Sequence, residues 1–217
     1  LALAALLATG VTAWMTRHLT AAPNPSAARV GFAWSRFAFG LAGYLMFGLG
    51  YIGYMTFIIT LLRERQVADG QIVAFYIVLG LAVMASSWLW AGLLQRSRGG
   101  GALALLNALL ALATLLPVMS AHPVVVFGSG ALFGAVFLSV VASTTALVRH
   151  NLPAPAWASG IGAFTIVFAA GQIVGPSLVG WVADGSGGLA RGFVWSAGLL
   201  ALGALLAWRQ KPLPAPG

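Results

Sequence analysis

Five polar side chains inside long apolar runs are the candidates for contact with a solute: Tyr44, Tyr51, Tyr54, Ser143 and Gln172. Tyr44 and Tyr51 are seven residues apart, so they share one face of a helix. The alternative is a tightly packed helix whose tyrosine hydroxyls bond to neighbouring helices. These residue types favour binding of a solute over its chemical transformation.

The residues that acid–base or metal chemistry requires are scarce. Glu64, Asp69 and Asp184 are the only carboxylate side chains, and each lies between apolar runs. The sequence has no cysteine, which excludes a disulfide, a thiolate metal site and a cysteine nucleophile. The three histidines fall on both sides of the expected spans, so no three-histidine site is expected. We therefore expect no enzyme activity, no cofactor and no metal site.

The elements that must position these side chains are membrane helices. Of 217 residues, 60% are hydrophobic and 6% charged, and the mean hydropathy is +0.97. About 20 apolar residues of helix cross a bilayer, and no run alternates as a barrel strand would. Seven runs lack Asp, Glu, Lys and Arg: 1–16, 37–62, 72–94, 102–120, 124–148, 157–182 and 192–208. The expected fold class is all-α, a polytopic membrane protein with seven transmembrane helices.

The first run and the long connection after it set the expected domains. The run 1–16 starts at Leu1 and lacks the basic segment of a signal peptide, so we expect the truncated last helix of a preceding bundle. The connection 17–36 contains two prolines and is typical of an interdomain linker. Residues 37–208 then form a six-helix bundle, and 209–217 a cytoplasmic tail.

The basic residues indicate topology. Eleven Lys and Arg against three acids give a net charge of +8, but they occur singly or in pairs, which argues against nucleic acid as a partner. Most of them lie on the side of the linker and the C-terminus, which places that side in the cytoplasm. The eight tryptophans lie near span ends, as membrane anchors do. We expect a multi-pass protein of the bacterial cytoplasmic (inner) membrane.

The run 124–148 combines glycines with hydroxyls. Gly130 and Gly134 share one face, and Ser139, Ser143 and Thr144 follow. Each hydroxyl is expected to bond back to the preceding turn, although together they form a moderately polar face. Asn107, on another run, is expected to join helices rather than to bind a solute.

The most specific string is GQIVGPSLVG, which starts at Gly171. It spaces Gly171 and Gly175 by four residues and puts Pro176 inside an expected helix, where proline frees a carbonyl and bends the axis. In the run 37–62, Gly48 and Gly50 mark a middle segment that is expected to be unwound or bent.

This string resembles the Gly-Pro motif of major facilitator superfamily transporters, known best from the fifth helix of drug/proton antiporters. The stretch GYIGYMTFI, from Gly50, is similar to the bacterial YbfB/YjiJ-like branch of that superfamily. The resemblance covers 1–208 and implies that the seven runs are helices six to twelve. Those transporters often carry a Gly-x-x-x-Asp-Arg-x-Gly-Arg loop motif, of which Gly92, Arg96, Arg98 and Gly99 look like a remnant. Arg96 stands where the acid is expected.

The resemblance also implies the role of each helix. The runs 37–62 and 124–148 would line a cavity, and 72–94 and 157–182 would close it, the last bending at Gly175 and Pro176. The remaining two runs of the bundle, 102–120 and 192–208, would face lipid.

The implied function is that of one half of a secondary transporter. It would move a small organic solute by alternating access, with proton-coupled efflux as one form. Because no expected span carries a charged side chain, a coupling carboxylate is expected in the preceding helices. The expected partners are the lipid bilayer, a small-molecule substrate, protons and the preceding bundle. The alternative is a non-transporting membrane scaffold or assembly subunit.

Overall fold

The computed structural model describes residues 2–17 and 32–213, which are helical apart from short connections. The chain divides into two compact units, Leu1–Val30 and Gly31–Gly217. In the second unit, six helical segments are long and apolar enough to cross a membrane. The protein is therefore an all-α, polytopic membrane protein.

The first unit contains a single described helix, α1 (Ala2–Thr16). It coincides with the first apolar run and, at 15 residues, is shorter than the six spans of the second unit. The linker expected over 17–36 lies for the most part outside the described residues.

The second unit contains two short 3-10 helices and seven α-helices: η1 (Trp34–Phe37), α2 (Ala38–Glu64), α3 (Asp69–Leu89), α4 (Ala91–Arg96), α5 (Gly101–Met119), α6 (Pro123–Asn151), η2 (Ala154–Ala156), α7 (Trp157–Ala183) and α8 (Gly188–Trp208). The expected spans match these helices to within a few residues at most ends. The sequence pattern predicts them well because an apolar run is the main requirement for a membrane helix.

Three details correct the expectations. The run 72–94 is interrupted at Trp90, which separates α3 from α4. The last helix starts at Gly188 rather than 192, so Arg191 belongs to its first turn. The segment 48–51 is helical like the rest of α2, so the expectation that it is unwound is wrong, while a bend there stays a prediction.

Local sequence explains several helix ends. Pro123 occupies the first turn of α6, where its missing N–H costs nothing, and Nδ1 of His122 accepts the N–H of Val124 at 3.3 Å. At the start of α8, Gly187 and Gly188 have φ of 126° and 57°, a backbone conformation that favours glycine. These two glycines make the tight turn from α7 to α8 possible.

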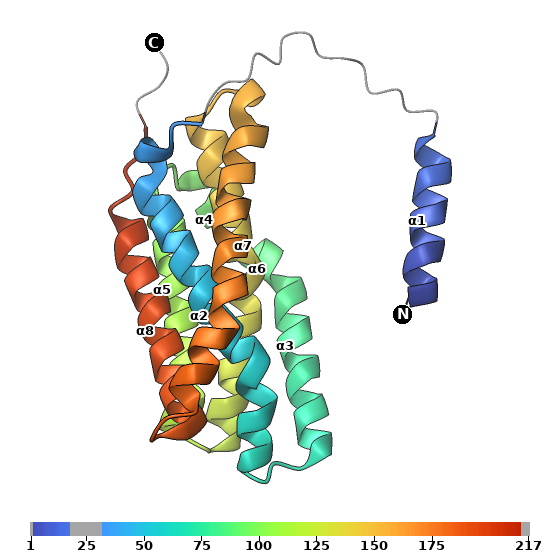
Figure 1. Ribbon diagram of the computed structural model, residues 1–217, viewed down its shortest axis with the longest axis vertical. Helices are drawn as coiled ribbons and strands as arrows, with labels where there is room; N and C mark the ends of the chain where they lie inside the picture. The colour runs from blue at the N-terminus through green and yellow to red at the C-terminus, as the bar shows by residue number, and fades with distance from the viewer. Residues whose placement is uncertain (1, 18–31, 214–217) are drawn as a thin grey trace. The chain divides into compact units, whose positions relative to one another are not determined.

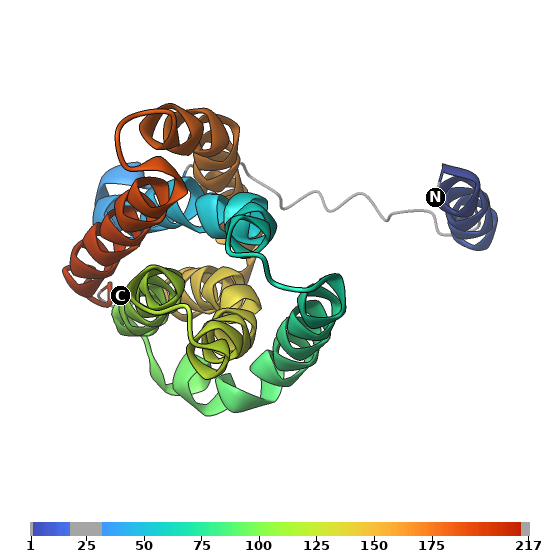
Figure 2. The ribbon, with the colours of Figure 1, turned by 90° about the horizontal axis from the view of Figure 1, so that it is seen from below.

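The six spans form two groups of three. α2 packs against α7 and α8, while α6 packs against α3 and α5. Seen end-on, α2, α7 and α8 lie together on one side of the bundle and α3, α5 and α6 on the other (Figure 2). Contacts between α5 and α8 and between α2 and α5 join the two groups, as the vertical view also shows (Figure 1).

α2 approaches its neighbours through glycines. A Cβ on Gly43 would lie 2.9 Å from the carbonyl oxygen of Gly203 on α8, and one on Gly50 would lie 2.7 Å from the carbonyl oxygen of Ser196. Small residues let membrane helices come this close. Gly50 is therefore a packing position of α2.

α3 and α7 are the least buried spans of the unit. Each exposes a row of large apolar side chains at helical spacing: Val73, Ile77, Leu81, Met84 and Trp88 on α3, and Ile166, Ile173, Val174 and Trp181 on α7. α5 is the most buried span, although Leu105, Leu112 and Met119 form an exposed row on it.

The start of the expected tail is part of the bundle. The Gln210 side chain is buried; its Oε1 accepts the N–H of Gly40, and its Nε2 donates to the carbonyl of Arg36, both at 3.0 Å. The Gln210 carbonyl accepts the N–H of Gly100 at 2.9 Å. Gln210 thus holds together the start of α2, the start of α5 and the end of α8.

Candidate functional site

Two of the five candidate side chains meet at the contact between α2 and α7. Gln172 donates a hydrogen bond from Nε2 to the hydroxyl of Tyr51, across 121 residues of sequence. Tyr51 is buried and Gln172 is half-buried, so the pair connects the core of the bundle to its surface. The Tyr51–Gln172 pair is a polar contact among mostly apolar side chains.

Around this pair, aromatic rings from three helices stack on one another. The Tyr51 ring stacks with Phe137 of α6 and Phe168 of α7, with centroids 5.3 and 5.6 Å apart. The Tyr44 ring stacks with Phe168 at 5.1 Å, and Phe47 stacks with both tyrosines. Phe137 and Phe168 are half-buried, and the two tyrosine rings lie beneath them. Offset-stacked rings of this kind offer a flat apolar surface.

Tyr54 lies apart from the pair, in a second cluster. Its ring stacks on Phe133 with centroids 4.1 Å apart, and its hydroxyl is 2.6 Å from Oγ of Ser129. Tyr54 is fully buried. Its hydroxyl therefore joins α2 to α6, as the packing alternative describes.

The hydroxyls of α6 turn inward. Ser143 and Thr144 donate to the carbonyls of Val140 and Val141 at 2.6 and 2.8 Å, which are the local bonds expected for a helix. Both side chains are buried. Ser143 thus bonds within its own helix and does not face the surface.

The Gly-Pro string places α7 against α2. A Cβ on Gly171 would lie 3.0 Å from the backbone of Gly48, and one on Gly175 would lie 2.9 Å from the carbonyl oxygen of Leu49. Pro176 lies inside α7 and has no N–H to donate to the carbonyl four residues earlier, which is that of Gln172. The residue that bonds Tyr51 therefore also carries a backbone carbonyl without its helical partner.

Polar bonds also join α3 to α6 and α5 to α2. Trp90 donates its indole N–H to the carbonyl of Ala135 at 2.7 Å, and Ser139 donates to the carbonyl of Ser86 at 3.1 Å. Asn107 is fully buried and donates from Nδ2 to the carbonyl of Gly43 at 3.2 Å. Its expected role in joining helices is confirmed.

The loop remnant lies at the end of the bundle where α8 ends. Gly92, Arg96 and Arg98 are exposed, and the carbonyl of Arg98 accepts a 2.7 Å bond from Nδ2 of Asn151. A Cβ on Gly99 would lie 2.8 Å from the Gln210 carbonyl oxygen. The glycine therefore lets residues 210–212 pack closely on this loop.

Sequence reasoning did not select Phe137, Phe168, Trp90 and Gln210. A signal for the first two exists, because Phe133 and Phe137 on α6 and Phe168 and Gln172 on α7 are each four residues apart and so share a helix face. Among the described residues, no group of His, Asp and Glu is arranged to hold a metal ion.

The six-helix bundle defines a polytopic helical membrane protein. The stacked rings of α2, α6 and α7, the aromatic face, form its candidate solute-binding surface. Residues 1–208 match the family model described as "Uncharacterised MFS-type transporter YbfB". The chain belongs to this family of major facilitator superfamily transporters. No curated protein and no solved structure matches the chain.

Proposed function

We propose that the chain is the part of a secondary active transporter that binds a small organic solute on the α2, α6 and α7 face. The observation that carries this proposal is the Tyr51–Gln172 hydrogen bond within a stack of aromatic rings from these three helices. Ligand sites are mostly apolar and aromatic with a few placed polar groups, and this face has that composition.

The chemistry of the face suggests the class of solute. Phe137 and Phe168 offer flat apolar contact, while Gln172 offers an amide that can exchange its bond to Tyr51 for one to the solute. Tyr44 stacks on Phe168 beside this position, and Ser143 and the buried Tyr54 would line the path once it opens. A solute with an aromatic or apolar body and one hydrogen-bonding group fits this face.

Alternating access would be produced by movement of α7 relative to α2. Gly171, Gly175 and Pro176 would allow α7 to bend, and Gly48 would let it slide along α2. The exposed apolar rows of α3 and α7 would face the preceding bundle, which completes the transport path.

Location and coupling follow from charge. The basic bias places the C-terminus in the cytoplasm of a bacterial cell, with the spans in the inner membrane. Tyrosine is the only ionisable residue of the aromatic cluster, and Glu64 and Asp69 lie at the ends of α2 and α3. Coupling to protons would therefore use a carboxylate of the preceding helices. Proton-coupled efflux of the solute is the form of transport that we favour.

Transport by the full-length protein in proteoliposomes tests the proposal, with a panel of labelled aromatic solutes. Tyr51→Phe and Gln172→Ala should each reduce the initial rate about ten-fold, which corresponds to loss of about 1.4 kcal/mol. Tyr76→Phe is the matched control, because Tyr76 lies on α3 away from the aromatic cluster. Unchanged uptake and efflux in both site variants would refute the proposed site.

Solvent access separates a transporter from a membrane scaffold. Because the sequence has no cysteine, single cysteines at positions 44, 51 and 143 can be introduced without removing any. Aqueous thiol reagents should label them in the full-length protein when a path opens during the transport cycle. A scaffold would leave all three unlabelled under every condition.

A further inference from the structure

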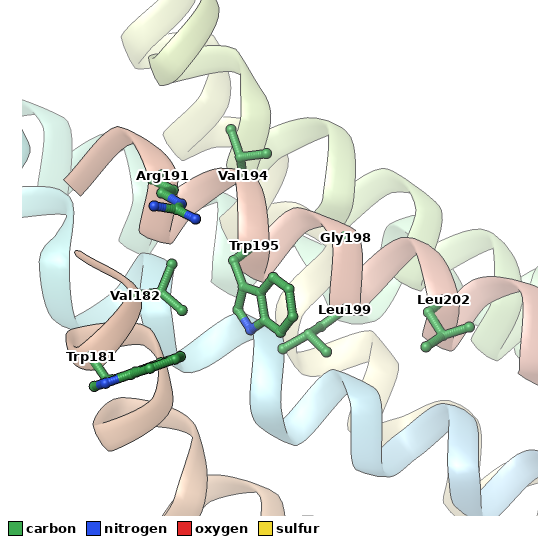
Figure 3. A pocket seen from close by; sticks show the side chains of 8 residues that line it. All are labelled: Trp181, Val182, Arg191, Val194, Trp195, Gly198, Leu199 and Leu202. Carbon is green, nitrogen blue, oxygen red and sulfur yellow. The ribbon is translucent and has the colours of Figure 1, made fainter. Parts of the chain in front are cut away.

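A groove between α7 and α8 is independent of the aromatic face. It has a volume of about 490 Å³, and its walls include the indoles of Trp181 on α7 and Trp195 on α8 (Figure 3). Arg191 lies at one end of the close-up and Leu202 at the other. The groove lies at the end of the bundle where α7 ends and α8 begins.

The shape of the groove suits a hydrocarbon chain. Arg191, Val194, Trp195, Gly198 and Leu202 follow one face of α8, and eleven residues of helix span about 16 Å. This length is close to one leaflet, half of a hydrocarbon core about 30 Å thick. Gly198 deepens the middle, because nothing lies within 4 Å of the position its Cβ would occupy. One acyl chain of a lipid can therefore lie along α8 from the interface towards the bilayer centre.

Charges of both signs line the mouth. A second hollow of about 320 Å³ adjoins the groove and is lined by Arg191 and by Asp184, which lies just beyond α7. No ion pair joins these two side chains in the described part of the chain. Nη1 of Arg191 donates to the Ser186 carbonyl at 3.3 Å, and a guanidinium has four further N–H groups.

We propose that this groove is a specific site for a phospholipid with an ethanolamine headgroup. The Arg191 guanidinium binds the phosphate, and the Asp184 carboxylate accepts hydrogen bonds from the primary ammonium group. One acyl chain occupies the groove between the two indoles and passes over Gly198. The paired charges select a headgroup that is both anionic and cationic, and the carboxylate favours an ammonium group that has N–H donors over a quaternary one.

Native mass spectrometry of the purified full-length protein tests this site with two lipids of identical chains, phosphatidylethanolamine and phosphatidylcholine. The wild type should retain one phosphatidylethanolamine, with about five-fold preference over phosphatidylcholine, since one such bond contributes about 1 kcal/mol. Asp184→Asn should abolish the preference. Arg191→Gln should lower the affinity for both lipids about five-fold.

Filling the groove tests the position of the chain. Gly198→Leu should remove the retained lipid without a clash, since the space beside Gly198 is open. Gly128→Leu is the control, because Gly128 is equally open, exposed and towards the same end of the bundle. Thermal unfolding of each variant establishes that it is folded. Equal retention of the two lipids by the wild type, unchanged retention in Gly198→Leu, or a protein dimer that excludes lipid would each overturn the proposal.

Discussion

The contact between α2 and α7 and the contact between α3 and α6 join corresponding helices of the two groups, but they differ in construction. At the first, Gly48 and Gly171 bring the two backbones together, and one side-chain hydrogen bond joins the half-buried Gln172 to the buried Tyr51. At the second, Gly134 lies against the backbone of α3 at Leu79.

Directed hydrogen bonds fix the α3–α6 contact. The Trp90 indole and the Ser139 hydroxyl each donate to a backbone carbonyl of the opposite helix. Such bonds are lost when a helix shifts by a fraction of a turn, whereas a smooth glycine surface tolerates a small shift. We infer that α7 is the helix that can move and that α3 is fixed to its partner.

Added volume at the glycine contact should give the largest effect. Gly171→Ala should destabilise the bundle by about 1–3 kcal/mol, because its Cβ would lie 3.0 Å from the backbone of Gly48. Thermal unfolding of the purified protein measures this as a fall of several degrees. Gly162→Ala is the control on the same helix, since nothing lies near it, and it should be neutral or stabilising by up to about 1 kcal/mol. Equal melting temperatures for both variants would contradict a backbone contact at Gly171.

Restoring the missing backbone hydrogen bond of α7 should change the transport rate without lowering the stability of the protein. Pro176→Ala supplies an N–H to the Gln172 carbonyl, which stiffens α7. We expect transport about ten-fold slower, equivalent to about 1.4 kcal/mol, with stability unchanged or higher. Pro117→Ala makes the same change inside α5, away from the α2–α7 contact, and should leave the transport rate unchanged. If both variants slow transport equally, α7 has no special role in the motion.

The α3–α6 contact should depend on the Trp90 indole. Trp90→Phe keeps an aromatic side chain, although a smaller one, and removes the 2.7 Å bond to Ala135, so we expect a loss of about 1 kcal/mol and a melting temperature about 2–4 °C lower. Trp88→Phe provides the comparison, because Trp88 is 86% exposed. A fall of the same size in the Trp88 variant would show that the loss comes from the ring and not from the bond.

The smallest effect should come from the second directed bond. Ser139→Ala should cost about 0.6 kcal/mol, the average for a hydrogen bond between membrane helices. Ser143→Ala removes a hydroxyl that bonds within its own helix, so its stability should stay near that of the wild type. A chemical denaturation series can resolve the two variants. The hydroxyl bond of Ser139 would be dispensable if they unfolded together.

The spans were predictable because their signal is local. The run 37–62 becomes α2 (Ala38–Glu64), and the family resemblance seen in the Gly-Pro string is confirmed by the match over 1–208. The turn at Trp90 was not predicted, because the run 72–94 continues past it without a charged residue or a proline.

The sequence allowed single residues of the candidate site to be selected, but not the contacts between them. Tyr51 and Gln172 could be selected as polar groups in apolar runs, but their bond spans 121 residues and depends on how closely Gly48 and Gly171 let the helices approach. Gln210 gave no signal, since a glutamine beside basic residues after the last span resembles any polar tail. Its role arises from three helix ends that meet only in the folded bundle.

The bond from Gln210 to Gly40 has a consequence for synthesis, because its partners are 170 residues apart in the chain. At about 5–20 residues per second, a ribosome needs on the order of ten to thirty seconds to make that stretch. During this time, α2 lies in the membrane without α7 and α8, and its glycines that later contact these two helices are exposed. The helix made first in the bundle thus keeps part of its surface open until the last helix and Gln210 have been made.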